Sequence, residues 1–109
     1  MSPLNILRED TPAGPVLRVI GELDYDQASA LRRRVEGLSL GPAQCLVLDL
    51  SGMEYCDSTG ITALLAARQH AQSAGADIAL AAVPPDTLRI LTIVGLDQIF
   101  TIRPGTGAD

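Results

Sequence analysis

The sequence predicts a single α/β domain in which an opening β-hairpin is followed by alternating strands and helices. The chain has 109 residues, which suffices for one domain. Short apolar runs alternate with segments whose apolar residues recur every three or four positions, and Gly or Pro separates them. This alternation predicts a mixed, mostly parallel central sheet with helices packed on it. We expect a core over residues 4–102 and a polar tail over 103–109.

The opening hairpin is predicted from two apolar segments that flank a turn. Residues 3–8 alternate weakly between apolar and polar and fit a short edge strand. Residues 11–15 read Thr-Pro-Ala-Gly-Pro, a composition typical of a turn. The apolar residues from Val16 to Leu23 then predict a second strand of mixed burial.

The first helix is predicted after Asp24, which with Gln27 forms a variant capping box. Its buried stripe is expected to contain Ala28, Leu31, Val35 and Leu38. The three consecutive arginines 32–34 fall mostly off this stripe. They predict a solvated helix face, and a patch for an acidic partner is the alternative.

The most apolar strand is predicted at Cys45–Leu50, in the centre of the sheet and covered. We expect Ser51–Asp57 to be a loop and a second helix to follow it until Gly75. His70 lies about 160° around that helix from its apolar stripe, which predicts an exposed side chain. The stripe is expected to contain Ile61, Leu64, Leu65 and Ala71.

The last elements are a strand at Asp77–Val83, a helix from Pro84 to Gly95 and a short strand at Gln98–Ile102. Two apolar residues of the helix, Leu88 and Ile93, fall off the stripe that we expect to pack on the sheet. A neighbouring loop could cover them, or they could belong to a partner surface. That stripe is expected to contain Thr87, Ile90, Leu91 and Val94.

Charge and composition exclude several classes of function. The net charge is −5 and the isoelectric point is near 4.6, so we expect no nucleic-acid partner and no anionic membrane partner. All eight basic residues are Arg, so a Walker A loop, a Schiff-base lysine and a lysine general base are excluded. No signal peptide or membrane-length apolar run is present, which predicts a cytoplasmic protein. Two cysteines and one histidine predict neither a disulfide framework nor a metal site, and we expect no cofactor.

Polar groups crowd one strand–helix junction, where residues 56–60 read Cys-Asp-Ser-Thr-Gly. A nucleophile elbow would need Gly at position 56, and its base would have to be His70, about 18 Å away along the helix. A phosphoacceptor role for Asp49, as in receiver domains, would need a lysine. A plain helix start with Asp57 or Ser58 as N-cap remains, but it leaves the additional hydroxyl and carboxyl groups unexplained.

The strongest signal is a resemblance carried by three stretches in order. Residues 46–65 read LVLDLSGMEYCDSTGITALL, residues 21–24 read GELD and residues 94–100 read VGLDQIF. Together they resemble the STAS family, the bacterial anti-sigma factor antagonists, over roughly residues 4–102. The resemblance implies an α/β, STAS-like single domain whose helices lie mainly on one side of a mixed central sheet.

The resemblance also implies a regulator rather than an enzyme. Ser58 matches the family's phosphorylation site, and Asp24 corresponds to an acidic position near that site and the kinase contact. The implied partners are an anti-sigma factor serine kinase, which is an ATP-binding protein of the histidine-kinase-like ATPase type, and a serine phosphatase. The unphosphorylated chain would bind the kinase and free a sigma factor. The residues that we expect at the partner surface are Asp24, Asp57, Ser58, Thr59, Gly60, Leu88 and Ile93.

Two alternatives remain at this point. Some relatives with this fold are never phosphorylated, so the chain could be an accessory domain of a transport or stress-signalling assembly. Cys56, beside the site, could be a redox sensor, although a thiol that fills a small apolar gap is the simpler interpretation.

Overall fold

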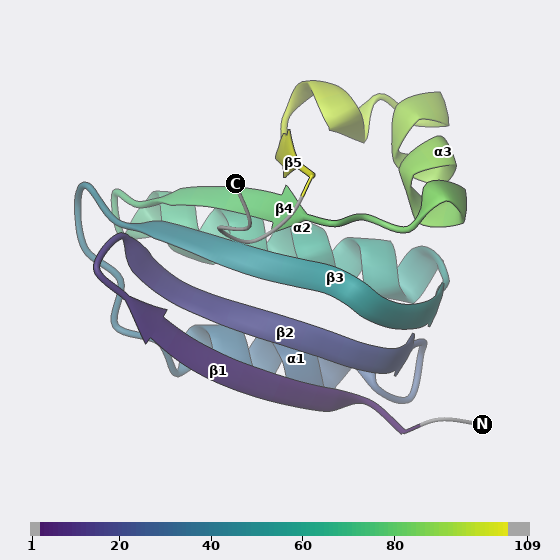
Figure 1. Cartoon of the computed structure of the whole chain (residues 1–109), viewed down its shortest axis with the longest axis horizontal. Coiled ribbons are helices and arrows are strands. Elements are labelled where there is room, and N and C mark those ends of the chain that lie inside the picture. The colour runs from purple at the N-terminus through teal and green to yellow at the C-terminus, as the bar shows by residue number, and fades with distance from the viewer. Residues whose placement is uncertain (1–2, 105–109) are drawn as a thin grey trace.

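The computed structural model describes residues 3–104 and confirms the α/β order of elements (Figure 1). Five strands form one sheet in the order β1-β2-β3-β4-β5, in which β1 pairs antiparallel with β2 and the other neighbours are parallel. The elements are β1 (Asn5–Thr11), β2 (Gly14–Leu23), α1 (Ala28–Glu36), β3 (Cys45–Cys56), α2 (Ser58–Ser73), β4 (Asp77–Ala81), α3 (Pro85–Ile93), the short 3-10 helix η1 (Leu96–Gln98) and β5 (Thr101–Arg103).

Helices α1 and α2 lie side by side on one face of the sheet, while α3 lies beyond the end of β4 (Figure 1). The buried core is mostly aliphatic, as the scarcity of aromatic residues requires, with Phe100 as its aromatic member. Each fully buried Leu or Val in it contributes about 1.5–3 kcal/mol relative to an exposed one. The largest of these side chains are Leu17, Val19, Leu23, Leu31, Val35, Leu46, Leu48, Leu50, Leu64, Leu80 and Leu91.

The predicted hairpin is confirmed, with β1 and β2 joined by a turn at Pro12 and Ala13. Gly14 follows the turn with a φ of +138°, and a Cβ there would collide with the carbonyl oxygen of Cys45. The three arginines of α1 are exposed, as predicted. One of them, Arg34, also donates from Nη1 to the carbonyl oxygen of Ile6 at 3.0 Å, which ties α1 to the edge strand.

The predicted loop at Ser51–Asp57 is wrong, because β3 continues to Cys56. Its second half pairs with the second half of β2, where Met53 lies opposite Gly21 and Cys56 lies opposite Leu23. Two register shifts in this pairing interrupt the alternation of apolar and polar residues. The sequence pattern of this second half is therefore typical of a loop, although its backbone pairs with β2.

The face that α2 buries differs in part from the predicted stripe. Leu64 and Ala71 are buried as predicted, but Ile61 and Leu65 are only half-buried, and small residues take their place. The prediction that His70 is exposed is wrong: it is half-buried, with Nε2 3.4 Å from the carbonyl oxygen of Leu38. Leu38 lies in the segment that follows α1, so this segment contacts the last turn of α2. The small residues that α2 buries are Gly60, Ala63 and Ala67.

Helix α3 has the predicted limits, with Pro85 in its first turn and Gly95 at a φ of +81° behind it. Its predicted packing stripe is wrong in part, because Thr87 and Leu91 are buried whereas Ile90 and Val94 are 42% and 57% exposed. The helix lies beyond the sheet, so only one narrow side of it is covered. Leu88 is half-buried and Ile93 is exposed.

The last strand is shorter than predicted, because η1 occupies the residues before it and β5 begins at Thr101. Most of the predicted tail at 103–109 lies outside the described residues. Within residues 3–104, no helix is long and apolar enough to cross a membrane.

Candidate functional site

Asp57 begins the second helix. Its backbone is extended, with φ −101° and ψ −172°, and its Oδ1 accepts a hydrogen bond from the backbone N–H of Gly60 at 3.0 Å. This bond satisfies one of the free N–H groups at the start of α2 and is typical of an N-cap aspartate. Of the two N-caps that the sequence allowed, the structure selects Asp57 rather than Ser58.

The second oxygen of Asp57 holds the loop between β2 and α1. Its Oδ2 accepts from the backbone N–H of Tyr25 at 3.2 Å, and the Asp57 N–H donates to the carbonyl oxygen of Leu23 at 3.4 Å. One side chain therefore joins two segments that are 32 residues apart in the sequence. These bonds bring the loop that contains Asp24 to the start of α2.

Asp24 shapes that loop. Its Oδ1 and its carbonyl oxygen both accept from the N–H of Gln27, each at 3.1 Å. The predicted capping box is only half correct, because Gln27 is itself the N-cap of α1 and its side chain makes no capping hydrogen bond. The turn leaves Tyr25 77% exposed beside the α2 start.

Ser58 is the first residue of α2, and its side chain is exposed. Thr59 is half-buried and faces α1 instead. The Oγ1 of Thr62 donates to the Ser58 carbonyl oxygen at 3.0 Å, which supports the first turn without engaging the Ser58 hydroxyl. A helix N-terminus favours negative charge, so a phosphate on this hydroxyl would lie in a suitable field.

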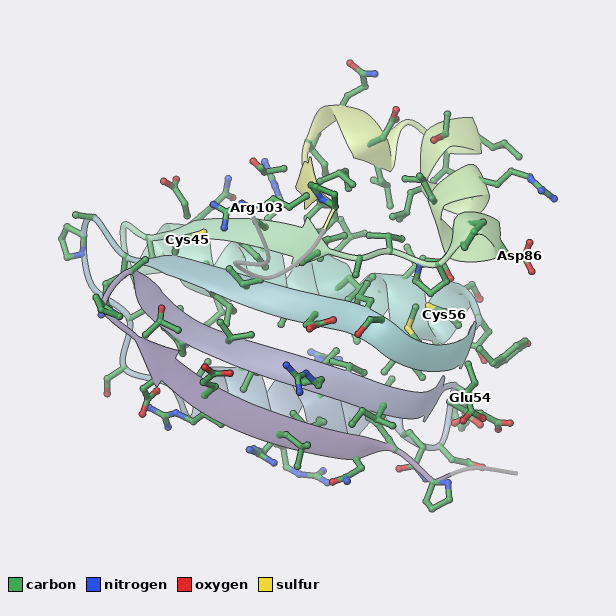
Figure 2. The ribbon with its side chains drawn as sticks, in the orientation of Figure 1. Cys45, Glu54, Cys56, Asp86 and Arg103 are labelled. Atoms are coloured by element: carbon green, nitrogen blue, oxygen red, sulfur yellow. The ribbon has the colours of Figure 1, made fainter. Side chains whose placement is uncertain are left out.

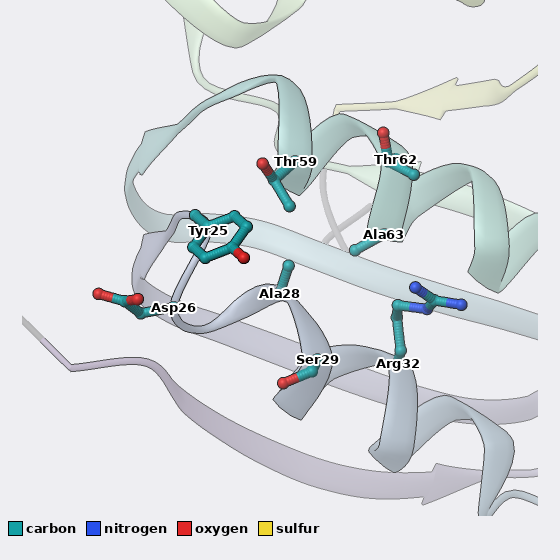
Figure 3. A pocket seen from close by; sticks show the side chains of 8 residues that line it. All are labelled: Tyr25, Asp26, Ala28, Ser29, Arg32, Thr59, Thr62 and Ala63. Atoms are coloured by element: carbon teal, nitrogen blue, oxygen red, sulfur yellow. The ribbon is translucent and has the colours of Figure 1, made fainter.

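Two hollows flank the start of α2. A cleft of about 410 Å³ lies between α1 and α2 (Figure 3), lined by Tyr25, Asp26, Ala28, Ser29, Arg32, Thr59, Thr62 and Ala63. A smaller hollow of about 210 Å³ lies between α2 and α3, lined by Cys56, Asp57, Ser58, Ile61, Ile90 and Val94.

Sequence reasoning missed four residues near the start of α2. Tyr25 and Tyr55 are exposed aromatic side chains in a chain with three aromatic residues, and this scarcity was the only signal that could have pointed to them. The helical spacing of Ile90 and Val94 predicts that both belong to the core. Nothing in that spacing shows that α3 lies off the sheet.

The two enzymatic interpretations of this junction find no support in the geometry. Asp49 is buried in β3, where its Oδ1 accepts from the Ser51 N–H at 2.9 Å and its Oδ2 lies 3.4 Å from the Nε of Arg18. It is therefore not presented as a phosphoacceptor. His70, the base that a nucleophile elbow would need, lies in the last turn of α2, where its ring contacts the carbonyl oxygen of Leu38. Within residues 3–104, no three His, Cys, Asp or Glu side chains are grouped to hold a metal ion.

Gly60 allows α2 to lie close to the end of β2. A Cβ at this position would collide with the carbonyl oxygen of Leu23 and lie 2.7 Å from the Sγ of Cys56. The absence of a side chain here is therefore a packing requirement. It fixes the distance between the phosphorylation candidate and the Asp24–Tyr25 loop.

We expect Gly60→Ala to lower the free energy of unfolding by about 1–3 kcal/mol or more, because backbone atoms cannot rotate out of the way. The helix propensity of Ala would offset at most about 1 kcal/mol of this loss. Gly37 is the control: its φ is −78°, and an added Cβ would lie 3.5 Å from the nearest atom. Urea unfolding should show Gly37→Ala unchanged or slightly more stable. Equal stability of the two variants would contradict the tight junction.

Burial raises the pKa of the Cys56 thiol to about 12, and the neighbouring Asp57 charge adds to the rise. The thiol also lies 3.6 Å from the Asp57 carbonyl oxygen, to which it donates. Because the thiolate is the reactive form, Cys56 is protonated and inert at neutral pH. This supports the gap-filling interpretation over the redox sensor.

We expect iodoacetamide at pH 8 to leave Cys56 unmodified in the folded protein and to modify it once the protein is unfolded in guanidinium. Cys45 is the internal reference, because it is only half-buried and should react first. Peptide mass spectrometry distinguishes the two sites. Alkylation of Cys56 as fast as that of Cys45 in the folded protein would show that the thiol is accessible.

Comparisons with known proteins agree with this geometry. A family model described as "Mlab, STAS domain" matches residues 6–104. A STAS-domain containing protein of Pseudomonas aeruginosa is 31% identical over 86 residues, which are 79% of this chain and 84% of that protein. An anti-sigma F factor antagonist of Paenibacillus polymyxa is 27% identical over 88 residues, 80% of this chain and 75% of that one.

A crystal structure of an anti-sigma factor antagonist from Mycobacterium paratuberculosis superposes with a TM-score of 0.79. The two chains are 30% identical, and the match covers 93% of this chain and 86% of the other. The family model alone spans nearly all of the described residues. The chain therefore belongs to the STAS family and is similar in sequence and structure to its anti-sigma factor antagonists.

Proposed function

We propose that this chain is an anti-sigma factor antagonist that is switched by phosphorylation of Ser58. The unphosphorylated form binds an anti-sigma factor kinase, an ATP-binding protein of the histidine-kinase-like ATPase type, and thereby frees a sigma factor. Phosphorylation releases the kinase, and a serine phosphatase restores the binding form. The observation that carries this proposal is the exposed Ser58 at the N-terminus of α2, beside a loop that Asp57 holds in place.

The switch acts on the interface rather than on the fold. A phosphate adds about −1.5 to −2 charge, and an exposed helix N-terminus stabilises an anion by about 0.3–1 kcal/mol. The domain should therefore stay folded. A partner surface that fits a neutral hydroxyl would instead bury an unpaired dianion close to Asp57 and Asp24. A cost of about 3 kcal/mol weakens binding more than about a hundredfold, which is enough to release the partner.

The chain itself needs no catalytic base, because the kinase performs the chemistry on Ser58. We therefore propose a regulator that is not an enzyme and that works in the cytoplasm beside its sigma factor. Thr59 and Gly60 support the first turn of α2, and the exposed Ile93 with the half-buried Leu88 extends the partner surface along α3.

A second function is favoured by the description of the family model, which names Mlab rather than an anti-sigma factor antagonist. In that case the chain would be an accessory domain of a transport or stress-signalling assembly. It would bind its partner through the same end of α2, and Ser58 would stay unmodified.

A pull-down from the source cells with the unmodified protein, followed by incubation of the retained complex with ATP, separates the two functions. Retention of an ATPase that acts as an anti-sigma factor and phosphorylates Ser58 supports the first proposal. Retention of a transport ATPase, with Ser58 unmodified in the presence of ATP, supports the second.

We expect Ser58→Ala to bind the kinase in the presence of ATP without release, and Ser58→Glu to bind about a hundredfold more weakly while it remains folded. Ser39→Glu is the control, because Ser39 is exposed in the loop after α1. Isothermal titration calorimetry with the purified kinase measures all three affinities. Equal affinities of the Ala and Glu variants at position 58 would show that charge there is not the switch.

A further inference from the structure

Two adjoining hollows lie at the end of the sheet where α2 begins. The 210 Å³ hollow between α2 and α3 shares Cys56 and Ile90 with a second hollow of about 350 Å³ between the end of β3 and the start of α3. We call these two neighbouring hollows together the α3 groove. The second hollow is lined by Met53, Glu54, Tyr55, Cys56, Pro84, Pro85, Asp86, Thr87 and Ile90.

The first half of the α3 groove is apolar. Ile61, Ile90 and Val94 supply its walls, and the last two are 42% and 57% exposed. Exposed aliphatic side chains that line one hollow together are typical of a surface that binds another molecule. A large aliphatic side chain of a partner would shield the Ile90 and Val94 side chains from water. This burial would stabilise the complex by about 25 cal/mol per Å² of buried apolar area.

The second half of the α3 groove is acidic. Glu54 and Asp86 are both exposed and line it, and no Arg is among its lining residues. Figure 2 shows both carboxylates at the same end of the molecule as Cys56, with Arg103 well away from them. Two carboxylates line this half and none of its lining residues is positively charged, which favours a cationic side chain.

We propose that the α3 groove binds a segment of the anti-sigma factor kinase in which a large aliphatic side chain stands beside an Arg or a Lys. The aliphatic side chain fills the half formed by Ile90 and Val94, and the basic side chain pairs with Glu54 and Asp86. The assignment rests on the function proposed above, because it names the surface through which that partner binds.

The same geometry explains how phosphorylation reaches this surface. Ser58 lines the apolar half of the α3 groove together with Ile61 and Val94. A phosphate on its hydroxyl would place a dianion at the wall that the partner's aliphatic side chain must contact. Apolar contact and phosphate are therefore incompatible in one hollow, since burying the charge without a partner costs several kcal/mol.

The test is calorimetric titration with the purified anti-sigma factor kinase that the pull-down retains. We expect Ile90→Lys, Val94→Lys and Glu54→Arg each to raise Kd at least about tenfold, the range of a partly buried contact. Leu7→Lys and Glu9→Arg on β1 are the controls. The exposed fraction of Leu7, 48%, is similar to that of Ile90, and Glu9 is exposed like Glu54. They should bind within about twofold of the wild type. Thermal unfolding confirms that each variant is folded.

Three unfavourable outcomes are distinguishable. If the wild type binds the kinase and the three groove variants bind equally well, the α3 groove is not the docking surface, although the proposed function stands. If the wild type retains no anti-sigma factor kinase, the proposed function fails and this assignment of the partner fails with it. Losses equal to those of the β1 controls would mean that general surface charge governs binding, which also contradicts the α3 groove.

Discussion

The carboxylate of Asp57 is the interaction on which the geometry of the site depends. One of its oxygens starts α2 through the Gly60 amide, and the other holds the β2–α1 loop through the Tyr25 amide. A carboxylate can accept both bonds at once, whereas the neutral caps Ser and Thr offer a single oxygen. The exposed Ser58 therefore has fixed surroundings although its own side chain is free of packing.

Packing under this junction is as restrictive as the hydrogen bonds above it. Gly60 leaves space only for the Leu23 backbone and the Cys56 thiol, so strand, loop and helix meet without a gap. The buried thiol stays protonated because a thiolate would be desolvated beside the Asp57 charge. The site thus has a tightly packed base and an open surface, which suits the phosphorylation of Ser58 that we propose.

The sequence predicted what depends on local chemistry. The hairpin, the central strand, the glycines that end α2 and α3, and the family resemblance are all confirmed, because turn residues and helical periodicity act over a few positions. The sequence-based predictions are wrong where the structure depends on contacts between segments that are far apart in the chain. The extension of β3 depends on pairing with β2, and the exposure of Ile90 and Val94 depends on where α3 lies relative to the sheet. No pattern within α3 carries that information.

Asp57 supports the helix and the loop with separate oxygens, and amide hydrogen exchange in the Asp57→Asn variant distinguishes these two roles. An asparagine keeps one acceptor oxygen and loses the other, and its cap on Gly60 is the bond expected to persist. We expect the Tyr25 amide to exchange much faster in this variant, while the Gly60 amide and the core of β3 keep their protection. Unchanged protection of the Tyr25 amide would show that the loop is held by something other than the Asp57 carboxylate.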